Sequence, residues 1–583
     1  MERAIRLKKY HPIHSGLARG AVLLWLCLPL ARAAEHPRTL YVRAGTVVDG
    51  DGTVNAPFAS LAAVERASTP GDEIVVQPAP LNVPPLDGGI SLKPHQKLIG
   101  GGPSVTSEAL PAELPRITNT DAGRHSGDAV VLADDVEVRN LVILSSYRGG
   151  IYGSDVNHVD IHDNNLAGTN TSCTPGFSVY FPGNLPMLAN GWAAIMVDEQ
   201  KGIAFLSIEH NFIHDGSCHD GIDIRATGGA QVAANVSANS ITRIAQGAAV
   251  RSVLAIGLQT RDDAVLSVVS DHNSETYIGS VDADCEGLFV NQTSGVVTWN
   301  ISYNTFAHGI GGISCNGAEF YSVAGTSTTN LYISHSLFED NPGDMIEEDN
   351  GGDTGSVMSL TLDDVTIRHT TFTKPSPPES KFIRGDTWDN LGRCMDQFSW
   401  GHENFNILRV FRSRISDCAG DAIGSDVTGG VFRLQSRSQE IDLGDAVGDS
   451  VLIDIESSKI EGTKQYVLHF ANHAAMNQLA IRVEDTLLGN AQGPAIVGFD
   501  QDAATRDVEI DLGGGKAMSG GGNCILGASS ELALEVTGYE AFAASNWWGS
   551  IKGLSQAKSS LTNSTLHAPT WLSAPPSACR TVR

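Results

Sequence analysis

Basic side chains are scarce in this chain of 583 residues. It has 39 Lys and Arg against 66 Asp and Glu, which gives a formal net charge of −27 at pH 7. A chain this acidic does not bind nucleic acid or an anionic membrane surface through its bulk charge. A polyanionic substrate would need a local basic groove or a bridging cation. We therefore predict no nucleic-acid partner.

Long apolar runs are also missing. The longest, Ala21–Leu30, is too short to span a bilayer comfortably. It follows a basic leader (Arg3 to Arg19) and precedes small residues at Ala31-Arg32-Ala33 that suit a cleavage site. The pattern predicts a signal peptide at residues 1–33, no transmembrane segment, and a secreted or periplasmic protein.

Several sequence motifs are absent. The chain has no CxxC pair, no nucleophile elbow and no Gly-rich phosphate loop between a strand and a helix, so it does not match a zinc ribbon, a serine hydrolase or a phosphate-loop enzyme. Of its nine cysteines, Cys27 falls in the predicted signal peptide. The remaining even number in an exported chain predicts disulfide bonds.

A short motif recurs along the chain, and helical patterns are almost absent around it. A β-branched residue is followed after two positions by a small polar residue and, two further on, by an apolar one. The polar positions are Asn164, Asn211, Asn239, Asn304, Ser336, Thr370, Ser413, Ser458 and Thr486. Steps of 28, 32 and 34 residues separate several of them, which indicates a repeat architecture. Each coil buries its apolar face only under the next coil, and the polar residues fit an inward column.

This pattern resembles the right-handed parallel β-helix, or pectin-lyase-like, superfamily. The predicted fold is all-β, a right-handed parallel β-helix solenoid with a short N-terminal helical cap; a propeller or a sandwich is the alternative. The predicted parts are a cap and entry segment at 34–89, the solenoid at 90–550 with loop insertions at 168–192 and 374–400, and a tail at 551–583. Asn546-Trp547-Trp548-Gly549 resembles the closing element of such solenoids.

The resemblance also implies a pairing of the cysteines, because neighbours in sequence lie on neighbouring coils of a solenoid. The expected bonds are Cys173–Cys218, Cys285–Cys315, Cys394–Cys418 and Cys524–Cys579. Sequence alone leaves the connectivity open.

The densest cluster of reactive side chains lies at the end of the segment Leu206–Arg225. His219, Asp220 and Asp223 are candidates for a general acid and base acting on a sugar, and Arg225 is a candidate to hold a uronate carboxylate. Asp, Asn and Gly are also the residues that make turns, so a structural role is the alternative.

Acids recur at similar places in successive coils. Asp220, Glu286, His308, Asp344 and Asp421 are expected to align along one ridge, where the acids repel one another unless they are protonated, solvated or bridged by a cation. Calcium is the predicted cation. The predicted ligands are Asp282, Asp284 and Glu286 on one coil and, on another, Asp344 together with Asp340, Glu347, Glu348, Asp349 and Asp353; a solvated acidic face is the alternative.

The same residues resemble polygalacturonase-type glycoside hydrolases. Cys218–Asp223, Asp282–Cys285 and Ala307–Gly309 echo that family's motifs in the right order, which implies catalytic roles for Asp220, Asp284 and His308. The gap of 64 residues from Asp220 to Asp284 is longer than neighbouring coils require, and no Arg-x-Lys pair is found.

Two functions fit these observations. The first is an exported carbohydrate-active enzyme, of lyase, hydrolase or epimerase type, whose partner is a polysaccharide. The second is a non-catalytic surface or envelope β-helix that binds glycan or protein. Convergence of Asp220, Asp223 and another acid or histidine beside the 168–192 loop favours the enzyme. The oligomeric state is not predicted.

Overall fold

The structure is a computed structural model. It describes residues 37–106, 112–181, 185–245, 252–280, 284–310, 315–352, 354–371, 380–382, 392–427, 431–434, 439–442, 448–472, 476–501, 507–527, 532–555 and 558–580. The predicted signal peptide (1–33), Asp282, Asp353 and most of the predicted 374–400 insertion lie outside these residues.

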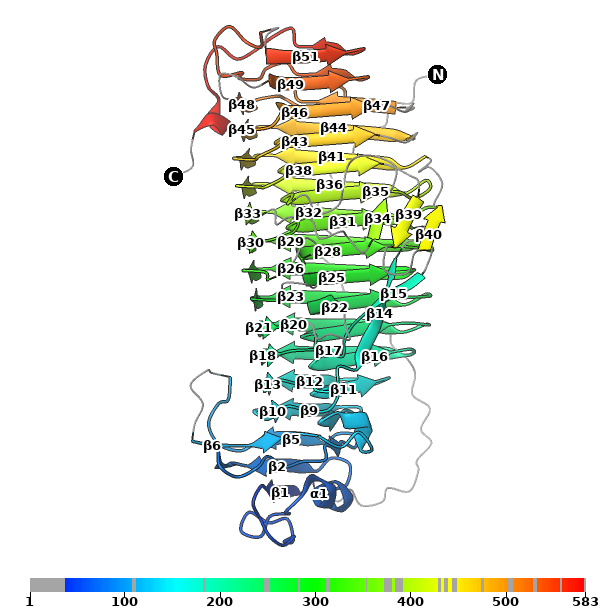
Figure 1. The fold of residues 1–583 in the computed structure, drawn as a ribbon, viewed down its shortest axis with the longest axis vertical. Helices are drawn as coiled ribbons and strands as arrows, with labels where there is room; N and C mark the ends of the chain where they lie inside the picture. Colours follow the sequence, from blue (N-terminus) through cyan, green and yellow to red (C-terminus); the bar gives the residue numbers. More distant parts are fainter. Residues whose placement is uncertain are drawn as a thin grey trace, which may run out of the picture. The chain divides into compact units, whose positions relative to one another are not determined.

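From Arg38 onward the described chain forms one unit built on three parallel sheets (Figure 1). Sheet 1 contains β1 (Thr39–Arg43), β2 (Glu73–Gln77), β5 (Lys97–Gly100), β9 (Val136–Arg139), β12 (Val159–His162), β17 (Ile203–Glu209), β20 (Gln231–Ser237), β23 (Val265–Asp271), β26 (Gly295–Ser302), β29 (Ser327–Ser334), β32 (Val357–Asp363), β36 (Phe405–Phe411), β41 (Ser450–Glu456), β44 (Gln478–Glu484), β47 (Asp507–Asp511), β50 (Glu540–Phe542) and β52 (Thr565–His567). Sheet 2 contains β7 (Arg116–Ile117), β10 (Val142–Leu144), β13 (Asn165–Ala167), β18 (Phe212–Gly216), β21 (Ser240–Ile244), β24 (Ser274–Thr276), β27 (Thr305–Ala307), β30 (Leu337–Asn341), β33 (Thr366–Thr370), β37 (Arg414–Ser416), β42 (Lys459–Glu461), β45 (Leu487–Gly489) and β48 (Cys524–Leu526). Sheet 3 contains β4 (Ile90–Ser91), β8 (Val130–Val131), β11 (Ile151–Ser154), β16 (Ile195–Glu199), β19 (Ile222–Ala226), β22 (Ser252–Thr260), β25 (Asp284–Gln292), β28 (Cys315–Ser322), β31 (Ile346–Asn350), β35 (Met395–Ser399), β38 (Ile423–Val427), β43 (Leu468–Asn472), β46 (Ala495–Gln501), β49 (Leu532–Thr537) and β51 (Ser559–Thr562).

Smaller elements leave the three sheets. The hairpin β14 (Pro175–Phe181) and β15 (Leu185–Gly191) runs across the strands in Figure 1, and β15 joins sheet 3 where Asn190 pairs with Ser252. The pair β3 (Ala79–Pro80) and β6 (Glu113–Leu114) and the sheet of β34 (Ser380–Phe382), β39 (Val431–Leu434) and β40 (Gln439–Asp442) are antiparallel.

The chain visits the three sheets in a fixed order, so that β16, β17 and β18 make one coil and β19, β20 and β21 make the next. Each strand pairs in parallel with its equivalent one coil later, as Ile195 does with Ile222 and Ile222 with Ile256. Alternate residues of each strand point inward, and those of β17 and β20 are buried in one continuous core. The prediction of a right-handed parallel β-helix is confirmed.

The inward polar column also exists, at the turn between sheets 1 and 2. Asn164 donates through Nδ2 to Oδ1 of Asn211 at 3.0 Å, Asn211 does the same to Asn239 at 3.0 Å, and Asn239 to Asn273 at 3.1 Å. The column continues through Ser413, Ser458, Thr486, Asn523 and Asn546. In this part the side-chain oxygen of each later residue accepts a hydrogen bond from the backbone N–H of the residue before it in the column. The column therefore extends to the predicted closing element.

Two coils depart from the expected motif. Thr366 pairs with Leu337, so the equivalent of Ser336 is Val365 and the placement of Thr370 in the column is wrong. Thr370 instead accepts from the N–H of Ala419 through its hydroxyl at 2.8 Å. The sequence motif did not identify Asn273 as a member of the column, because Ser270 and Glu275 occupy the two positions where the motif requires apolar residues.

The first coils cover the N-terminal end of the stack. β1 and β2 already pair in sheet 1, and helix α1 (Leu61–Ala67) follows Ser60, whose hydroxyl caps the helix by accepting from the N–H of Ala63. Leu61 and Val64 of the helix are fully buried against the core. The predicted helical cap is confirmed.

All four predicted disulfides are present: Cys173–Cys218, Cys285–Cys315, Cys394–Cys418 and Cys524–Cys579. No helix within the described residues has the length and apolar character needed to cross a membrane.

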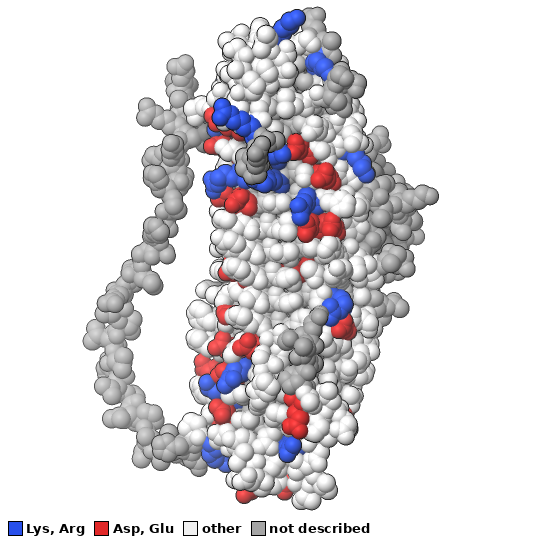
Figure 2. Space-filling view, turned by 90° about the vertical axis from the view of Figure 1, so that its left-hand side faces the viewer, with Lys and Arg blue, Asp and Glu red and all other residues white. Residues whose placement is uncertain are grey.

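On the face turned toward the viewer in Figure 2, acidic and basic side chains lie beside one another in small groups separated by uncharged surface. Sheet 2 contributes ion pairs of this kind, such as Arg243–Asp215 and Arg368–Glu339. Exposed pairs contribute about 0 to 1 kcal/mol each, so this face is a solvated surface.

Candidate functional site

The outer face of sheet 3 carries ionisable side chains that the stacking of coils does not require. In one outward row, successive coils place Met196, Asp223, Gly257, Phe289, Glu319, Glu347, Asp396, Gly424, His469, Gly498 and Glu535. The inward neighbours, such as Ile222 and Ile346, belong to the core. Three acids of this row, Asp223, Glu347 and Asp396, are buried even though they point outward.

The β14–β15 hairpin lies over the carboxyl pair Asp220 and Asp223. The amide Nδ2 of Asn190 on β15 donates to Asp220 at 2.5 Å and to Asp223 at 2.9 Å. Both carboxyls are fully buried, and burial raises their pKa values well above 3.8, with the charge of Asp220 adding to the shift of Asp223. The predicted convergence beside the 168–192 insertion is present, but the hairpin separates the pair from solvent.

The space around this pair is small. A cavity of about 10 Å³, enough for about one water molecule, lies between the hairpin and sheet 3, lined by Phe177, Asn190, Asp223, Leu254 and Phe289 among others. One oxygen of Asp223 has no hydrogen-bond partner there. A sugar reaches these carboxyls only if the hairpin lifts.

The other two residues predicted in this cluster have different surroundings. His219 is fully buried, its Nδ1 lies 2.9 Å from the carbonyl of Asp220, and burial lowers its pKa to about 4, so the ring is neutral at neutral pH. Arg225 forms a two-point ion pair with Asp198 at 2.8 and 2.6 Å and stacks on the ring of Phe177. Its guanidinium is therefore already paired in this structure.

The predicted ridge aligns four of its five members. Continuing the register of sheet 3 places Asp220, Glu286, Asp344 and Asp421 at equivalent positions. Three of these carboxylates accept a backbone N–H from the next coil, from Leu254 at 3.0 Å, Arg393 at 2.6 Å and Tyr466 at 2.9 Å. These acids thus form a structural ladder comparable to the asparagine column.

His308 does not belong to this ridge, which corrects the predicted alignment. It follows β27 of sheet 2, where it bonds to Asp340 at 2.9 Å and stacks on Tyr277. Asp220 and His308 both lie in connections from sheet 2 to sheet 3, but His308 directly follows β27 at the sheet 2 end of its connection, whereas Asp220 lies just before β19 at the sheet 3 end. Asp284 begins β25, two coils beyond the coil of Asp220, and Asp282 lies outside the described residues.

A candidate metal site lies on neighbouring strands. Among the residues described, one group of three acids, Glu319, Glu347 and Asp349, brings a carboxylate oxygen from each within 4.8 Å of the others. Asn316 donates to Glu347 at 2.6 Å beside it. Three carboxylates on two adjacent strands are a donor set that fits calcium. The predicted ligand Asp344 instead accepts from the backbone of Arg393.

Arg393 occupies the ridge position between Asp344 and Asp421. Its guanidinium is 2.6 Å from Asp396 and 3.4 Å from Asp421, and all three side chains are nearly inaccessible to solvent. The guanidinium lies over Gly424, where a Cβ would come within 2.8 Å of Cζ. The glycine therefore makes room for a buried cation beside two acids.

An imidazole and a phenol extend this cluster by one coil. His469 lies 3.4 Å from Asp421, its ring stacks on Tyr466 at 4.4 Å, and the Tyr466 hydroxyl donates to Glu535 at 2.9 Å. Burial alone would raise the pKa of Asp421, but the hydrogen bond with His469 and the charge of Arg393 outweigh it and hold that pKa below 3.8. The side chain of His469 retains about a fifth of its surface, and Tyr466 is also only partly buried, so this end of the cluster reaches solvent.

Sequence reasoning missed Arg393, Asp396, His469 and Tyr466. They belong to coils whose repeat motif is weak, and no sequence motif marks them. The detectable signal is the charged or imidazole residue that follows the apolar first residue of each strand, Asp396 in β35 and His469 in β43. Alternation places these residues on the outer face, where packing does not restrict the side chain.

The fold and this cluster define the protein as a right-handed parallel β-helix with an acid-rich outer face on one sheet. No family model matches the chain, and no curated protein matches it. Among solved structures, the A-module of the Azotobacter vinelandii mannuronan C-5 epimerase AlgE4 is 11% identical, with coverage of 77% of this chain and 89% of its own and a TM-score of 0.32.

Two further solved structures show likeness of the same order. DFA-IIIase from Arthrobacter chlorophenolicus A6, in complex with GF2, is 12% identical over 77% of this chain and 87% of its own, with a TM-score of 0.33. The periplasmic alginate epimerase AlgG is 9% identical over 90% of this chain and 84% of its own, with a TM-score of 0.30. The likeness is one of fold.

Proposed function

We propose that this protein is an exported carbohydrate-active enzyme that performs acid–base chemistry on a polysaccharide lying along the outer face of sheet 3. The supporting observation is the cluster of His469, Asp421, Tyr466, Arg393 and Asp396 on that face. A polysaccharide substrate accords with the sequence-based prediction of a carbohydrate-active enzyme. Four disulfides fit a secreted or periplasmic location.

The cluster contains the groups that proton transfer at a sugar requires. In the proposed roles His469 exchanges the proton, Asp421 orients its ring, and Tyr466 is the second proton-transferring group. Arg393 stabilises the negative charge of the buried carboxylates Asp396 and Asp421. Burying these charges costs free energy that stacking of the coils does not demand, which favours a role in function.

The assay measures new reducing ends and the absorbance of unsaturated products on a panel of acidic and neutral polysaccharides. Replacing the imidazole in His469→Gln is expected to lower kcat by about 100-fold or more with the melting midpoint unchanged. His567→Gln is the matched control, because His567 also stacks on an aromatic ring and bonds to an acid, but on sheet 1. Turnover that survives in His469→Gln contradicts the assigned role. Silence of the wild type on every substrate favours the non-catalytic binder.

A second candidate site is the pair Asp220 and Asp223. Two carboxyls held by one amide, with pKa values shifted upward, match the acid and base of glycoside hydrolysis. This candidate requires the hairpin to lift. Asp223→Asn distinguishes the two sites, because it abolishes turnover only if this pair is catalytic. His219, Arg225, Asp284 and His308 remain untested proposals from the sequence.

We also propose that Glu319, Glu347 and Asp349 hold a calcium ion. Calcium there would supply positive charge near the cluster, where an acidic sugar would otherwise be repelled. Addition of calcium to EDTA-treated protein is expected to raise the melting midpoint, and Glu347→Gln to remove that increase. Asp364→Asn, an exposed acid on the opposite side of the coils, is the control. An equal calcium response in wild type and Glu347→Gln contradicts this site.

A further inference from the structure

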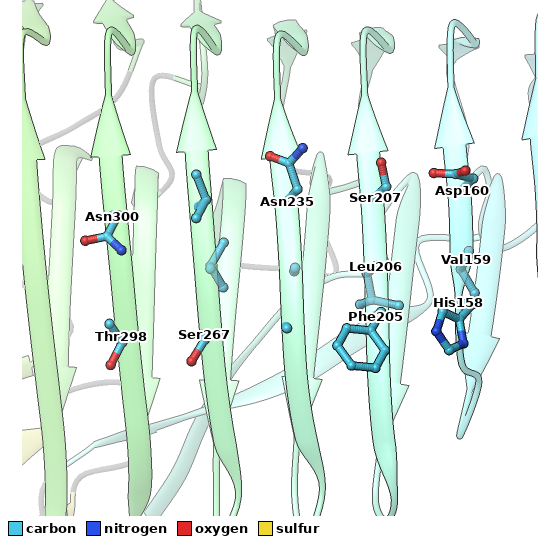
Figure 3. Close-up of a pocket in the computed structure, with 14 residues that line it drawn as sticks. His158, Val159, Asp160, Phe205, Leu206, Ser207, Asn235, Ser267, Thr298 and Asn300 are labelled. Carbon is cyan, nitrogen blue, oxygen red and sulfur yellow. The ribbon is translucent and has the colours of Figure 1, made fainter. Parts of the chain in front are cut away.

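A groove lies on the outer face of sheet 1, on another side of the coils from the candidate active site. Its volume is about 510 Å³, and it extends across β12, β17, β20, β23 and β26 (Figure 3). In Figure 3 the lining side chains form two rows, one with Asp160, Ser207, Asn235 and Asn300 and one with His158, Phe205, Ser267 and Thr298. A groove that crosses five strands runs along the axis of the solenoid.

The lining of the groove is almost uncharged, although the chain as a whole is strongly acidic. Asp160 and His158, both at one end, are the ionisable side chains among the lining residues, and no Lys or Arg is among them. A polyuronate, a nucleic acid or a phospholipid headgroup would find no cation there. The chemistry of the lining favours a neutral ligand.

Several polar side chains in the groove have no hydrogen-bond partner within the described protein. Ser267, Thr298 and Asn300 point into the groove and make no such bond. Ser267 and Thr298 occupy paired positions on the adjacent strands β23 and β26, about 4.8 Å apart along the groove, and Asn300 lies two residues beyond Thr298 on β26. A ligand that lies over these three side chains must itself carry hydrogen-bonding groups.

An aromatic surface closes one end of the groove. The rings of His158 and Phe205 stack with centroids 5.0 Å apart, and Phe205 is 48% exposed. An exposed ring at the end of a row of amides and hydroxyls has the apolar face and polar surroundings that bind a sugar ring. The groove is hollow between Phe205 and Thr298 because the side chains in register between them, Ala233 and Ser267, are small.

We propose that this groove binds a neutral polysaccharide chain along the solenoid axis, with one sugar stacked on Phe205. The groove is separate from the proposed catalytic cluster, so it is a second carbohydrate-binding surface. It would hold the protein on a neutral glycan while sheet 3 remains free.

The test is native affinity electrophoresis of the purified full chain through gels that contain hydroxyethylcellulose, xylan, galactomannan or laminarin, with alginate and polygalacturonate as acidic comparisons. At least one neutral polymer is expected to retard the wild type. Phe205→Ala is expected to weaken that binding about tenfold, which corresponds to about 1.4 kcal/mol. Ser267→Arg, which fills the groove, is expected to weaken it further.

Phe405→Ala is the matched control. Phe405 is 49% exposed on β36 of the same sheet and outside the groove, so its loss is expected to change binding less than twofold. The proposal is overturned if no neutral polymer retards the wild type, if Phe405→Ala weakens binding as much as Phe205→Ala, or if Phe205→Ala acts by abolishing self-association. His469→Gln is expected to leave groove binding intact, which separates this proposal from that of catalysis.

Discussion

Glu275 occupies an inward position in sheet 2 that apolar side chains fill in the adjoining coils. It lies between Ile241 and Phe306 in the register, it is fully buried, and neither carboxyl oxygen has a hydrogen-bond partner. Burial raises its pKa to about 8. The folded protein therefore retains a proton between pH 4.5 and pH 8 that the unfolded chain releases, and stability falls as the pH rises through this range.

Glu275→Gln is expected to remove this pH dependence. Between pH 5 and pH 8 the free energy of unfolding of the wild type is expected to fall by about 3 to 4 kcal/mol through this group. The free energy of unfolding of Glu275→Gln is expected to show no such fall. Urea unfolding followed at both pH values measures the difference. Glu403→Gln, which neutralises an exposed acid, serves as the control. Parallel pH profiles for wild type and Glu275→Gln would contradict the buried-acid account.

Asn239 is a central member of the polar column. Its side chain donates to the carbonyl of Ile208 at 2.8 Å and accepts from the backbone of Asn211 at 3.0 Å. Asn239→Ala leaves these buried groups unpaired and is expected to lower the free energy of unfolding by about 2 to 4 kcal/mol. Asn330→Ala, on the exposed face of sheet 1, is expected to change it by less than about 0.5 kcal/mol. Equal effects in denaturant titration would refute the column's importance.

At the residue scale the sequence predicted the column because an inward turn restricts which side chains fit. Asn, Ser and Thr satisfy turn backbone in a dry interior, so the motif survives in Ser413, Ser458 and Thr486 despite changed letters. It failed at Val365 and Glu275, where the local sequence departs from the rule. The candidate site was less predictable because outward positions obey no packing rule, and Arg393 and His469 meet only through stacking.

At the scale of elements, the β14–β15 hairpin is a cover whose attachment depends on protonation. Asn190 bonds to both Asp220 and Asp223, whose pKa values are raised chiefly by burial. Because burial under the hairpin raises these pKa values, the covered state favours the protonated acids. The hairpin is therefore attached most strongly at low pH, and its attachment weakens as the pH rises. The predicted 168–192 insertion is such an element, but the sequence did not show that it would lie over its own candidate residues.

Asn190→Ala removes the donor that joins the hairpin to the two acids. Hydrogen exchange of the amides in β14 is expected to be faster than in the wild type, and the difference is expected to grow from pH 5 to pH 8 after correction for intrinsic exchange. Exchange in β17, which lies on sheet 1 away from the hairpin, provides the internal control. Unchanged protection of β14 at both pH values would show that Asn190 does not hold the cover.

At the scale of the whole molecule, the solenoid is a one-dimensional stack in which each coil depends on its neighbours. The parallel pairing of each strand with its equivalent one coil later was predictable for all three sheets, because a repeat that buries apolar residues only by stacking allows few other folds. The first and last coils have a neighbour on one side only, so each end exposes unpaired strand edges and part of the core. Helix α1 and the first strands cover the N-terminal end.

Val64 tests the importance of that cover. It is fully buried where α1 packs on the core, so Val64→Asp places an unpaired charge there and is expected to detach the helix. Detachment exposes the apolar end of the stack while the distant coils, held by their own neighbours, remain folded. Light scattering after size-exclusion chromatography is therefore expected to show concentration-dependent association with little change in far-ultraviolet circular dichroism. Arg66→Asp adds the same acid to a less buried position of the same helix and is expected to stay dispersed; a monomeric Val64→Asp protein would show that the end needs no cover.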